Sequence, residues 1–436
     1  MDNAVVASAF VVLGLLALLA TGVWMFAAML VVSAVGLFVL KDYSFERIGS
    51  LMEAVLWKST TSYELAALPL FVWMAEILFR TRLSEQLFRG IAPWVNWLPG
   101  RLLHVVVLAS GIFGSVSGSS AATCATISKI ALPEMKRRGY DEGLVIGALA
   151  SGGTLGMLIP PSIVMVIYAV AAEVSLVKLM IAGIIPGLIT MALFSAYIAG
   201  WSLLNPARNP AGMAAMRLRE RLAASVELLP TFLLLVFVFG ALFAGWITAT
   251  ECAAWSVLGS LVIALASRTL TWQGFVGSIV GTLRTSAMII VLVAAAGFMS
   301  SFMAVAGIPK ALAEAVSGMG LSPYMLIALL TFVYIVLGIF LDGISMILLT
   351  LPVVLPIVTA AGFDPIWFGI FLIICIEMAE LSPPVGFNLF VLQNLTGHNV
   401  FDIGKMSLPF FLMIMLSVVI FTVWPQIVLW LPRVVG

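Results

Sequence analysis

The sequence predicts an all-α membrane protein that crosses the bilayer several times and is built from an inverted repeat, with two re-entrant helical hairpins and two broken helices. Three observations predict this fold. Of the 436 residues, 63% are hydrophobic and only 9% are charged, a balance that suits lipid and not a water-soluble domain. The chain also matches itself at a fixed offset, and its apolar spans are interrupted at corresponding points of the two halves.

Long apolar runs indicate how often the chain crosses the membrane. They cover residues 4–40, 65–78, 228–246, 253–266, 287–303, 324–340 and 410–431. Because about 20 apolar residues cross a hydrocarbon core, these runs predict roughly ten to twelve crossings or half-crossings. The run from Ala4 has neither a basic segment before it nor a small-residue cleavage site, so we expect a retained span.

Charge and cysteine content exclude several classes of function. The net charge of +1 indicates neither a nucleic-acid surface nor an acidic tail. Cys124, Cys252 and Cys375 lie far apart in apolar segments, and His104 and His398 are isolated, so we expect packed side chains and no metal or redox site. A membrane enzyme would need a cluster of His, Asp and Glu, or a nucleophile beside a base. The sequence offers neither, and we predict that the chain is not an enzyme.

An internal repeat relates the two halves. A shift of 223 residues, without gaps, pairs Leu132-Pro133 with Leu355-Pro356, Gly139-Tyr140-Asp141 with Gly362-Phe363-Asp364, and Pro160-Pro161 with Pro383-Pro384. The matches include Gly, Pro and Asp, which are scarce in membrane spans. A duplicated unit explains them better than chance does.

The matched loops differ in charge. The loop 133–141 carries Lys136, Arg137 and Arg138, whereas its partner, 356–364, has no basic residue. By the positive-inside rule the two loops face opposite sides of the membrane, which defines an inverted-topology repeat. A parallel duplication with drifted charge is the alternative. Four arginines in the segment 204–222, between the halves, predict a cytoplasmic linker that is partly an amphipathic interfacial helix, or else a plain solvated connector: Arg208, Arg217, Arg219 and Arg221.

Each half has two interruptions. In the first half, the Ser/Gly segment 114–120 separates apolar arms that are each about 18 Å long as a helix, too short to span alone. Both short arms fit in the membrane if they form a re-entrant hairpin whose tip is buried in protein or lines a watery cavity. The second interruption, 156–162, contains Pro160-Pro161, which frees backbone carbonyls. The equivalent segments of the second half are the tip 340–343 and the break 379–386.

Interrupted helices offer binding groups in the membrane. Freed carbonyls and hydroxyls make oxygen cages for a small cation, and half-helix N-termini favour an anion. This arrangement is typical of secondary transporters, whose sites lie near the bilayer midplane. We therefore predict a site where the four interruptions meet. The alternative is that Gly and Ser only allow close packing and that the prolines are kinks.

A few carboxylates fall inside or beside apolar spans. Asp342, at the second tip, is expected either to cap the following half-helix or to contact solute or ion. Glu377 and Glu380 flank the second break and are open to either a structural or a ligand-contacting role. Glu251 is expected to cap a helix start.

Several of these segments resemble the large membrane subunit of tripartite ATP-independent periplasmic (TRAP) transporters, the dicarboxylate and sialic acid permease family. The resemblance covers nearly the whole chain. In the first half it rests on 68–71 (LPLF), 117–120 (SGSS), 133–135 with 139–140, and 159–162 (IPPS). In the second half it rests on 248–254 (TATECAA), 307–309 (GIP), 342–343 (DG), 382–386 (SPPVG) and 388–390 (NLF).

The resemblance implies an ion-transporter-type elevator fold, in which a transport domain slides past a scaffold in a bacterial inner membrane. Scaffold helices and an interfacial arm would occupy 1–60, further scaffold helices 176–285, and a C-terminal scaffold helix 401–436. The transport repeats would occupy 61–175 and 286–400.

Site residues also follow from the resemblance. One sodium site would use carbonyls and hydroxyls around Ser115, Ser117, Gly156, Ile159 and Pro161, and its symmetric counterpart Gly338, Phe340, Ala379, Ser382 and Pro384. Plausible solute contacts are Ser119, Ser120, Thr123, Asp342 and Asn388. The sequence departs from the family pattern in the second site, where the family usually has Gly, an apolar residue and Thr in place of Ala379, Glu380 and Ser382.

The implied cargo is a small organic anion with a carboxylate, coupled to Na⁺, with no organic cofactor. Implied partners are a small four-helix membrane subunit, separate from this chain, and a periplasmic substrate-binding protein. No nucleic acid is implied. The alternative is a relative of the divalent-anion/sodium symporters that works without a binding protein, although their Ser-Asn-Thr tip motifs are absent. An ion channel is disfavoured, since this chain carries its symmetry internally.

Overall fold

The computed structural model describes residues 2–208, 210, 217–226, 228–384 and 386–435, and within these ranges every regular element is a helix. The N-terminal apolar run forms two helices joined by a short turn. The helices before the first hairpin are α1 (Asp2–Ala20), α2 (Met25–Lys41), α3 (Phe45–Thr60), a 3₁₀ turn η1 (Tyr63–Ala66), α4 (Ala67–Phe79) and α5 (Leu83–Val95). A bend of 54° separates α3 from the η1–α4 segment.

The first repeat contains the predicted hairpin and broken helix. Its helices are α6 (Leu102–Ser117), α7 (Ser120–Arg137), α8 (Glu142–Leu158) and α9 (Ile163–Ala171). Only Gly118 and Ser119 separate the hairpin arms, so the prediction of an irregular tip over 114–120 was too long. The small residues before Gly118 stay helical because they pack closely against α8 (below), and packing outweighs their weak helix propensity. The break between α8 and α9 bends the span by 43°.

The middle of the chain joins the repeats. Its elements are α10 (Leu176–Leu204), η2 (Pro206–Arg208), α11 (Leu218–Val226), α12 (Leu229–Phe243), α13 (Ala249–Ala266), α14 (Trp272–Ala306) and α15 (Ile308–Gly318). Of the predicted linker 204–222, residues 209 and 211–216 lie outside the described residues. The rest agrees with a partly helical linker, since α11 contains Arg219 and Arg221. As predicted, Glu251 completes a capping box with Thr248 at the start of α13.

The second repeat contains α16 (Pro323–Leu337), α17 (Gly343–Ala360), α18 (Pro365–Glu380) and α19 (Phe387–Thr396). The segment 401–436, expected to form one scaffold helix, holds most of α20 (Val400–Val423) and all of α21 (Gln426–Val435). Pro133 and Pro356 lie inside α7 and α17, so both loops begin later than predicted. A membrane helix tolerates such prolines when neighbouring groups satisfy the freed carbonyls.

The helix starts keep the register of the sequence repeat. The helices α7 and α17 begin at Ser120 and Gly343, and α8 and α18 begin at Glu142 and Pro365, so each pair is 223 residues apart. The N-cap side chains also correspond: Ser119 and Asp342 cap the second hairpin arms, and Asp141 and Asp364 cap α8 and α18. Both Pro-Pro pairs are joined by cis peptide bonds. The duplication inferred from the sequence is therefore a structural repeat.

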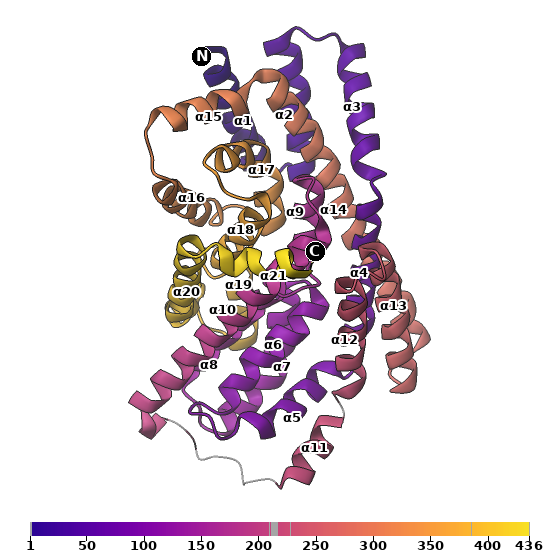
Figure 1. The fold of residues 1–436 in the computed structure, drawn as a ribbon, viewed down its shortest axis with the longest axis vertical. Helices are drawn as coiled ribbons and strands as arrows, with labels where there is room; N and C mark the ends of the chain where they lie inside the picture. Colours follow the sequence, from indigo (N-terminus) through magenta and orange to yellow (C-terminus); the bar gives the residue numbers. More distant parts are fainter. Residues whose placement is uncertain (1, 209, 211–216, 227, 385, 436) are drawn as a thin grey trace.

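The two hairpins lie at opposite ends of the molecule. Figure 1 shows α6 and α7 in the lower half and α16 and α17 in the upper half. The linker lies on the same side as the basic loop, because Arg208 pairs with Asp141 at 3.3 Å and Arg101 donates to the carbonyl of Pro210. Opposite hairpins and a basic lower end agree with the inverted orientation.

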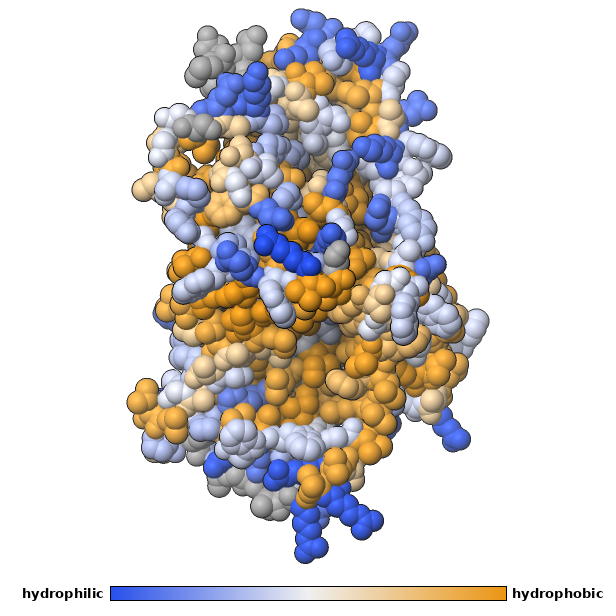
Figure 2. Space-filling model, in the orientation of Figure 1, coloured by the Kyte–Doolittle hydropathy of each residue, from blue (hydrophilic) through white to orange (hydrophobic). Residues whose placement is uncertain are grey.

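Length and composition fit a multi-pass membrane protein. Within the described ranges five helices could cross a bilayer, or eight spans if each bent pair counts as one, and five shorter apolar helices include the hairpin arms α6 and α16. Figure 2 shows a hydrophobic band across the lower middle of the molecule, with hydrophilic side chains at the upper and lower ends and a smaller group of them at the centre of the view, above the band.

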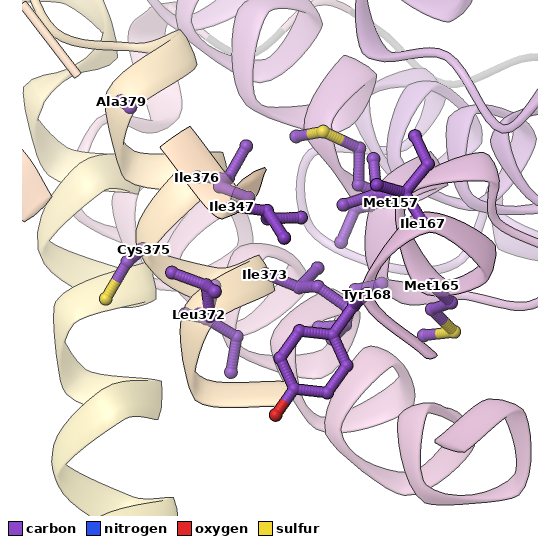
Figure 3. Packing of buried hydrophobic residues seen from close by; sticks show 14 of the residues in the cluster. Met157, Met165, Ile167, Tyr168, Ile347, Leu372, Ile373, Cys375, Ile376 and Ala379 are labelled. Atoms are coloured by element: carbon purple, nitrogen blue, oxygen red, sulfur yellow. The ribbon is translucent and has the colours of Figure 1, made fainter. Parts of the chain in front are cut away.

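The repeats share an apolar core. Figure 3 shows Met157, Ile167 and Tyr168 of the first repeat facing Ile347 and Ile373 of the second. The Tyr168 hydroxyl donates to the Pro365 carbonyl at 2.6 Å, so this buried ring also satisfies its polar atom. This core holds the two broken helices together.

Candidate ion and solute site

The first hairpin touches the first broken helix through backbone. A Cβ added to Gly114 would lie 2.6 Å from the Cα of Gly156, so only glycine fits where α6 crosses α8. Gly118, in the left-handed region at φ +59°, brings the tip against the amide of Ile163, 3.0 Å from where its Cβ would lie. The tip and the break of the first repeat are therefore in direct contact.

Buried hydroxyls surround this contact. The Ser117 hydroxyl lies 2.7 Å from that of Thr123, and Thr123 donates to the Ser119 carbonyl at 2.8 Å. Ser115 donates to the carbonyl of Ile112 at 2.8 Å. Ser115, Ser117 and Thr123 are all buried. The structure thus brings Ser115, Ser117 and Gly156 of the first predicted sodium set close to two of the predicted solute contacts, Ser119 and Thr123.

The second repeat repeats the contact with different residues. A Cβ on Gly338 would overlap the side chain of Ala379, so α16 crosses α18 as α6 crosses α8. The hydroxyl of Ser382, on the same break, donates to the Met378 carbonyl at 2.8 Å. Phe340 is 72% exposed and Pro384 is exposed, whereas the residues of the first set are buried or half-buried. The second predicted set is thus the more open one. Residue 385 of the predicted break lies outside the described residues.

Asp342 is the N-cap of α17. Its carboxylate accepts the backbone N–H groups of Ile344 at 3.1 Å and Ser345 at 3.2 Å, and also the Ser345 hydroxyl. The predicted capping role is confirmed. Contact of Asp342 with solute or ion stays a prediction.

Asn388 ties the two repeats together. The Ser120 hydroxyl donates to its side-chain oxygen at 2.9 Å, and its amide donates to the Ala150 carbonyl at 2.8 Å. Asn388 is fully buried. Both predicted solute contacts in this group, Ser120 and Asn388, are therefore joined to each other, and the tip of the first hairpin meets the second break.

Some buried polar atoms at the breaks lack partners among the described residues. The Ser162 hydroxyl, 1% exposed, directly follows Pro160-Pro161, and both carboxylate oxygens of the fully buried Glu377 are unpartnered. One oxygen of Glu380 is also buried and unpartnered. Sequence reasoning did not select Ser162 as a site residue, although its position after two prolines was a usable signal.

The donor set suits a sodium ion better than a transition metal. Among the described residues no group of three or more His, Cys, Asp or Glu side chains could hold a metal ion. What the breaks offer instead is helix-end carbonyls and the hydroxyls of Ser115, Ser117, Ser162 and Ser382. Oxygen ligands of this kind fit hard cations.

A cleft of about 950 Å³ lies between α3, α14, the end of α9 and α17. One wall comes from α3 and α14 and the other from the end of α9 and from α17. The Lys58 ammonium and the Glu173 carboxylate, 3.1 Å apart, lie at this cleft and join α3 to the segment after α9. A smaller apolar hollow of about 280 Å³ borders Ser115, Ile159 and Pro160 and is closed by α10 and α12.

Two inverted hairpin-and-break units in a chain of apolar helices define a multi-pass transporter subunit of the inner membrane. The sequence model of the family described as "Tripartite ATP-independent periplasmic transporter, DctM component" matches residues 12–427. The chain belongs to this family, and the resemblance drawn from its motifs is confirmed.

Known relatives agree in length and kind. The chain is 32% identical to the C4-dicarboxylate TRAP transporter large permease protein DctM of Pseudomonas aeruginosa, over 87% of this chain and 89% of that protein. It is 29% identical to the ectoine/5-hydroxyectoine TRAP transporter large permease protein UehC of Ruegeria pomeroyi, over 84% and 85%. The crystal structure of the Alcanivorax borkumensis YdaH transporter has a similar fold, with a TM-score of 0.67 at 12% identity over 98% of both chains. The named relatives of this chain are transporter permeases, so this chain is a permease subunit and not an enzyme.

Proposed function

We propose that this chain is the permease subunit of a sodium-coupled importer that carries a small organic acid across the inner membrane by an elevator movement. The observation that supports it most is the meeting of the interrupted segments. The first tip touches both breaks, through Ile163 and Asn388, and the second tip touches the second break through Ala379. Such a meeting point in the membrane interior is where secondary transporters bind their cargo.

Sodium is the proposed coupling ion. At the first break, Ser115, Ser117 and the carbonyls around Gly156, Ile159 and Pro161 would surround it, with the unpartnered Ser162 hydroxyl as an additional ligand. At the second break, Gly338, Phe340, Ala379, Ser382 and Pro384 would do so. Bound sodium supplies positive charge beside the tips, where this chain has no basic side chain of its own.

The solute and partners are proposed from the family and its members. The relatives named above are permeases for C4-dicarboxylates and for ectoines, which favours a small solute with a carboxylate. The tripartite family description favours two further components, a small membrane subunit and a periplasmic substrate-binding protein. Ser119, Ser120, Thr123, Asp342 and Asn388 are the proposed solute contacts, directly or through the groups they position.

The test is uptake into proteoliposomes that contain this chain and its small membrane subunit. We expect accumulation of the solute only when an inward sodium gradient and the binding protein are both present. A potassium gradient of the same size is the control for osmotic and potential effects. Uptake that ignores sodium and the binding protein would contradict the proposal.

A carrier that works without a binding protein is the second candidate, as in the divalent-anion/sodium symporters. Sodium-driven uptake that proceeds equally well without the binding protein would favour it.

A further inference from the structure

The cleft of about 950 Å³ opens on the side of the membrane opposite the basic loop. The α8–α9 pair forms one bent span that starts beside this loop, at Glu142, and ends at Ala171. The cleft is lined by residues that directly follow this end, including Glu173 and Ser175. Since the basic loop faces the cytoplasm, the cleft faces the periplasm, from which a binding protein delivers solute.

The cleft has one polar and one apolar wall. Ser59, Thr61, Ser62, Ser300 and Ser301 line it from the side of α3 and α14, and Leu348, Leu351, Pro352 and Leu355 line it from α17. The Ser62 hydroxyl is buried and has no partner among the described residues. Polar groups on one wall and apolar side chains on the other suit a small amphiphilic solute.

The charge of the cleft is the informative feature. Its lining contains one cation, Lys58, and two carboxylates, Glu64 and Glu173. Lys58 is already paired with Glu173 at 3.1 Å, and no basic side chain of the described residues pairs with Glu64. A solute with two carboxylates would meet unbalanced negative charge here, whereas a positively charged group of a solute could pair with the Glu64 carboxylate.

The route of the solute beyond the cleft also has an excess of acidic side chains. At the proposed binding site the acidic side chains are Asp342, Glu377 and Glu380, and both Glu377 oxygens and one Glu380 oxygen are buried without a partner among the described residues. Two separate places on the route of the solute therefore have more carboxylates than basic groups.

We infer that the periplasmic cleft admits a zwitterionic solute, which carries an ammonium or amidinium group beside its carboxylate, and that it disfavours dicarboxylates. Lys58 would receive the carboxylate in exchange for Glu173, and Glu64 and Glu173 would receive the positive group. This inference rests on the proposed import function, since the cleft selects a solute only if solute passes through it.

Thiol labelling tests the charge of the cleft without any transport. The native cysteines are all buried, so Ser300→Cys in the full-length chain, in nanodiscs, would be the accessible thiol of the cleft. We expect a cationic methanethiosulfonate to modify it faster than an anionic one, by about tenfold at low ionic strength relative to the exposed control Thr21→Cys. Adding Glu64→Gln, which leaves Lys58 paired with Glu173 and the cleft without net charge, should bring the ratio back to that of the control. A ratio at Ser300→Cys no higher than the control overturns the inference.

A matched pair of probes tests the solute class. Succinate and 4-aminobutyrate both have four carbons and one carboxylate, and they differ at the other end, which is a second carboxylate in succinate and an ammonium-bearing methylene in 4-aminobutyrate. We expect 4-aminobutyrate to protect Ser300→Cys from N-ethylmaleimide at a concentration at least about tenfold lower than succinate does. Equal protection, stronger protection by succinate, or protection by neither overturns the inference. A failure of sodium-driven uptake would overturn the proposed function instead, and labelling would still report the charge of the cleft.

Discussion

Glu380 is the residue at which this chain departs most in charge from the usual pattern of its family. It ends α18, directly before the second break, and one of its carboxylate oxygens is buried without a partner among the described residues. A carboxyl group at this place lies beside the proposed second sodium set, where it would carry its negative charge against a bound cation. Its removal is therefore expected to weaken the attraction for a cation at this place.

We expect Glu380→Leu to raise the sodium concentration needed for half-maximal uptake by about tenfold, the effect of roughly 1.4 kcal/mol of lost attraction. Initial rates of uptake across a sodium series give this value. Glu46→Gln, which removes an exposed carboxylate on α3, is the matched control and should leave the series unchanged. The same sodium dependence in Glu380→Leu and the unmodified chain would refute the role assigned to Glu380.

Asn388 has a structural role that can be separated from transport. Its replacement by Ala leaves the buried Ala150 carbonyl and the Ser120 hydroxyl without their partner. We expect Asn388→Ala to lower the free energy of unfolding by about 1–3 kcal/mol. Thermal unfolding in detergent measures the loss, and Asn394→Ala, an exposed site on the same helix, should unfold like the unmodified protein. Equal stability of the two variants would show that the hydrogen bonds of Asn388 between the repeats do not contribute to the free energy of unfolding.

At the scale of elements, the crossing of α6 and α8 depends on two glycines. The neighbour of an added Cβ on Gly114 is backbone, which cannot turn aside as a flexible side chain can. The hairpin therefore either moves away from the broken helix or strains the backbone, and both outcomes disturb the proposed first sodium set.

We expect Gly114→Ala to cost about 1–3 kcal/mol of stability and to reduce uptake. Gly49→Ala is the matched control, because an added Cβ there meets nothing within 4 Å on the helix α3. Removing a flexible glycine from a helix should stabilise the control by about 0.5–1 kcal/mol. Melting curves and uptake rates of the two variants, measured side by side, decide the matter. If Gly114→Ala behaves like Gly49→Ala, the close approach is not required.

At the scale of the whole molecule, the elevator proposal requires the repeats to move against the flanking helices. The Lys58–Glu173 ion pair joins these two parts at the cleft. Both side chains are largely exposed, so the pair adds little stability and its rupture would not oppose a movement strongly.

We expect a short bismaleimide linking Lys58→Cys to Glu173→Cys to stop uptake, since it fixes the two parts at one relative position. Each single-cysteine variant, treated with the same reagent, should keep transporting. The pair Asp402→Cys and Lys405→Cys lies within α20, where the native side chains are 3.5 Å apart, and its linkage should not affect uptake. Undiminished uptake by the linked Lys58/Glu173 pair would argue against sliding.

Much of this architecture was predictable because it depends on residues that are neighbours in the chain. Apolar runs place the chain in lipid, and Pro-Pro pairs break helices wherever they occur. The offset of 223 residues correctly aligned the starts of α7 with α17 and of α8 with α18. The cap at Asp342 was likewise readable from its place before a half-helix.

The tertiary structure decided what depends on residues far apart. Which small residues stay helical at the tips follows from packing between α6 and α8, and no local pattern encodes that contact. The bond from Ser120 to Asn388 spans 268 positions of the chain, and the acidic cleft joins side chains from α3, η1, α9, α14 and α17. Local sequence therefore determined where the helices begin and break, because capping and proline act within a turn. The folded chain alone determined which breaks meet and what charge the solute encounters, because those depend on long-range packing.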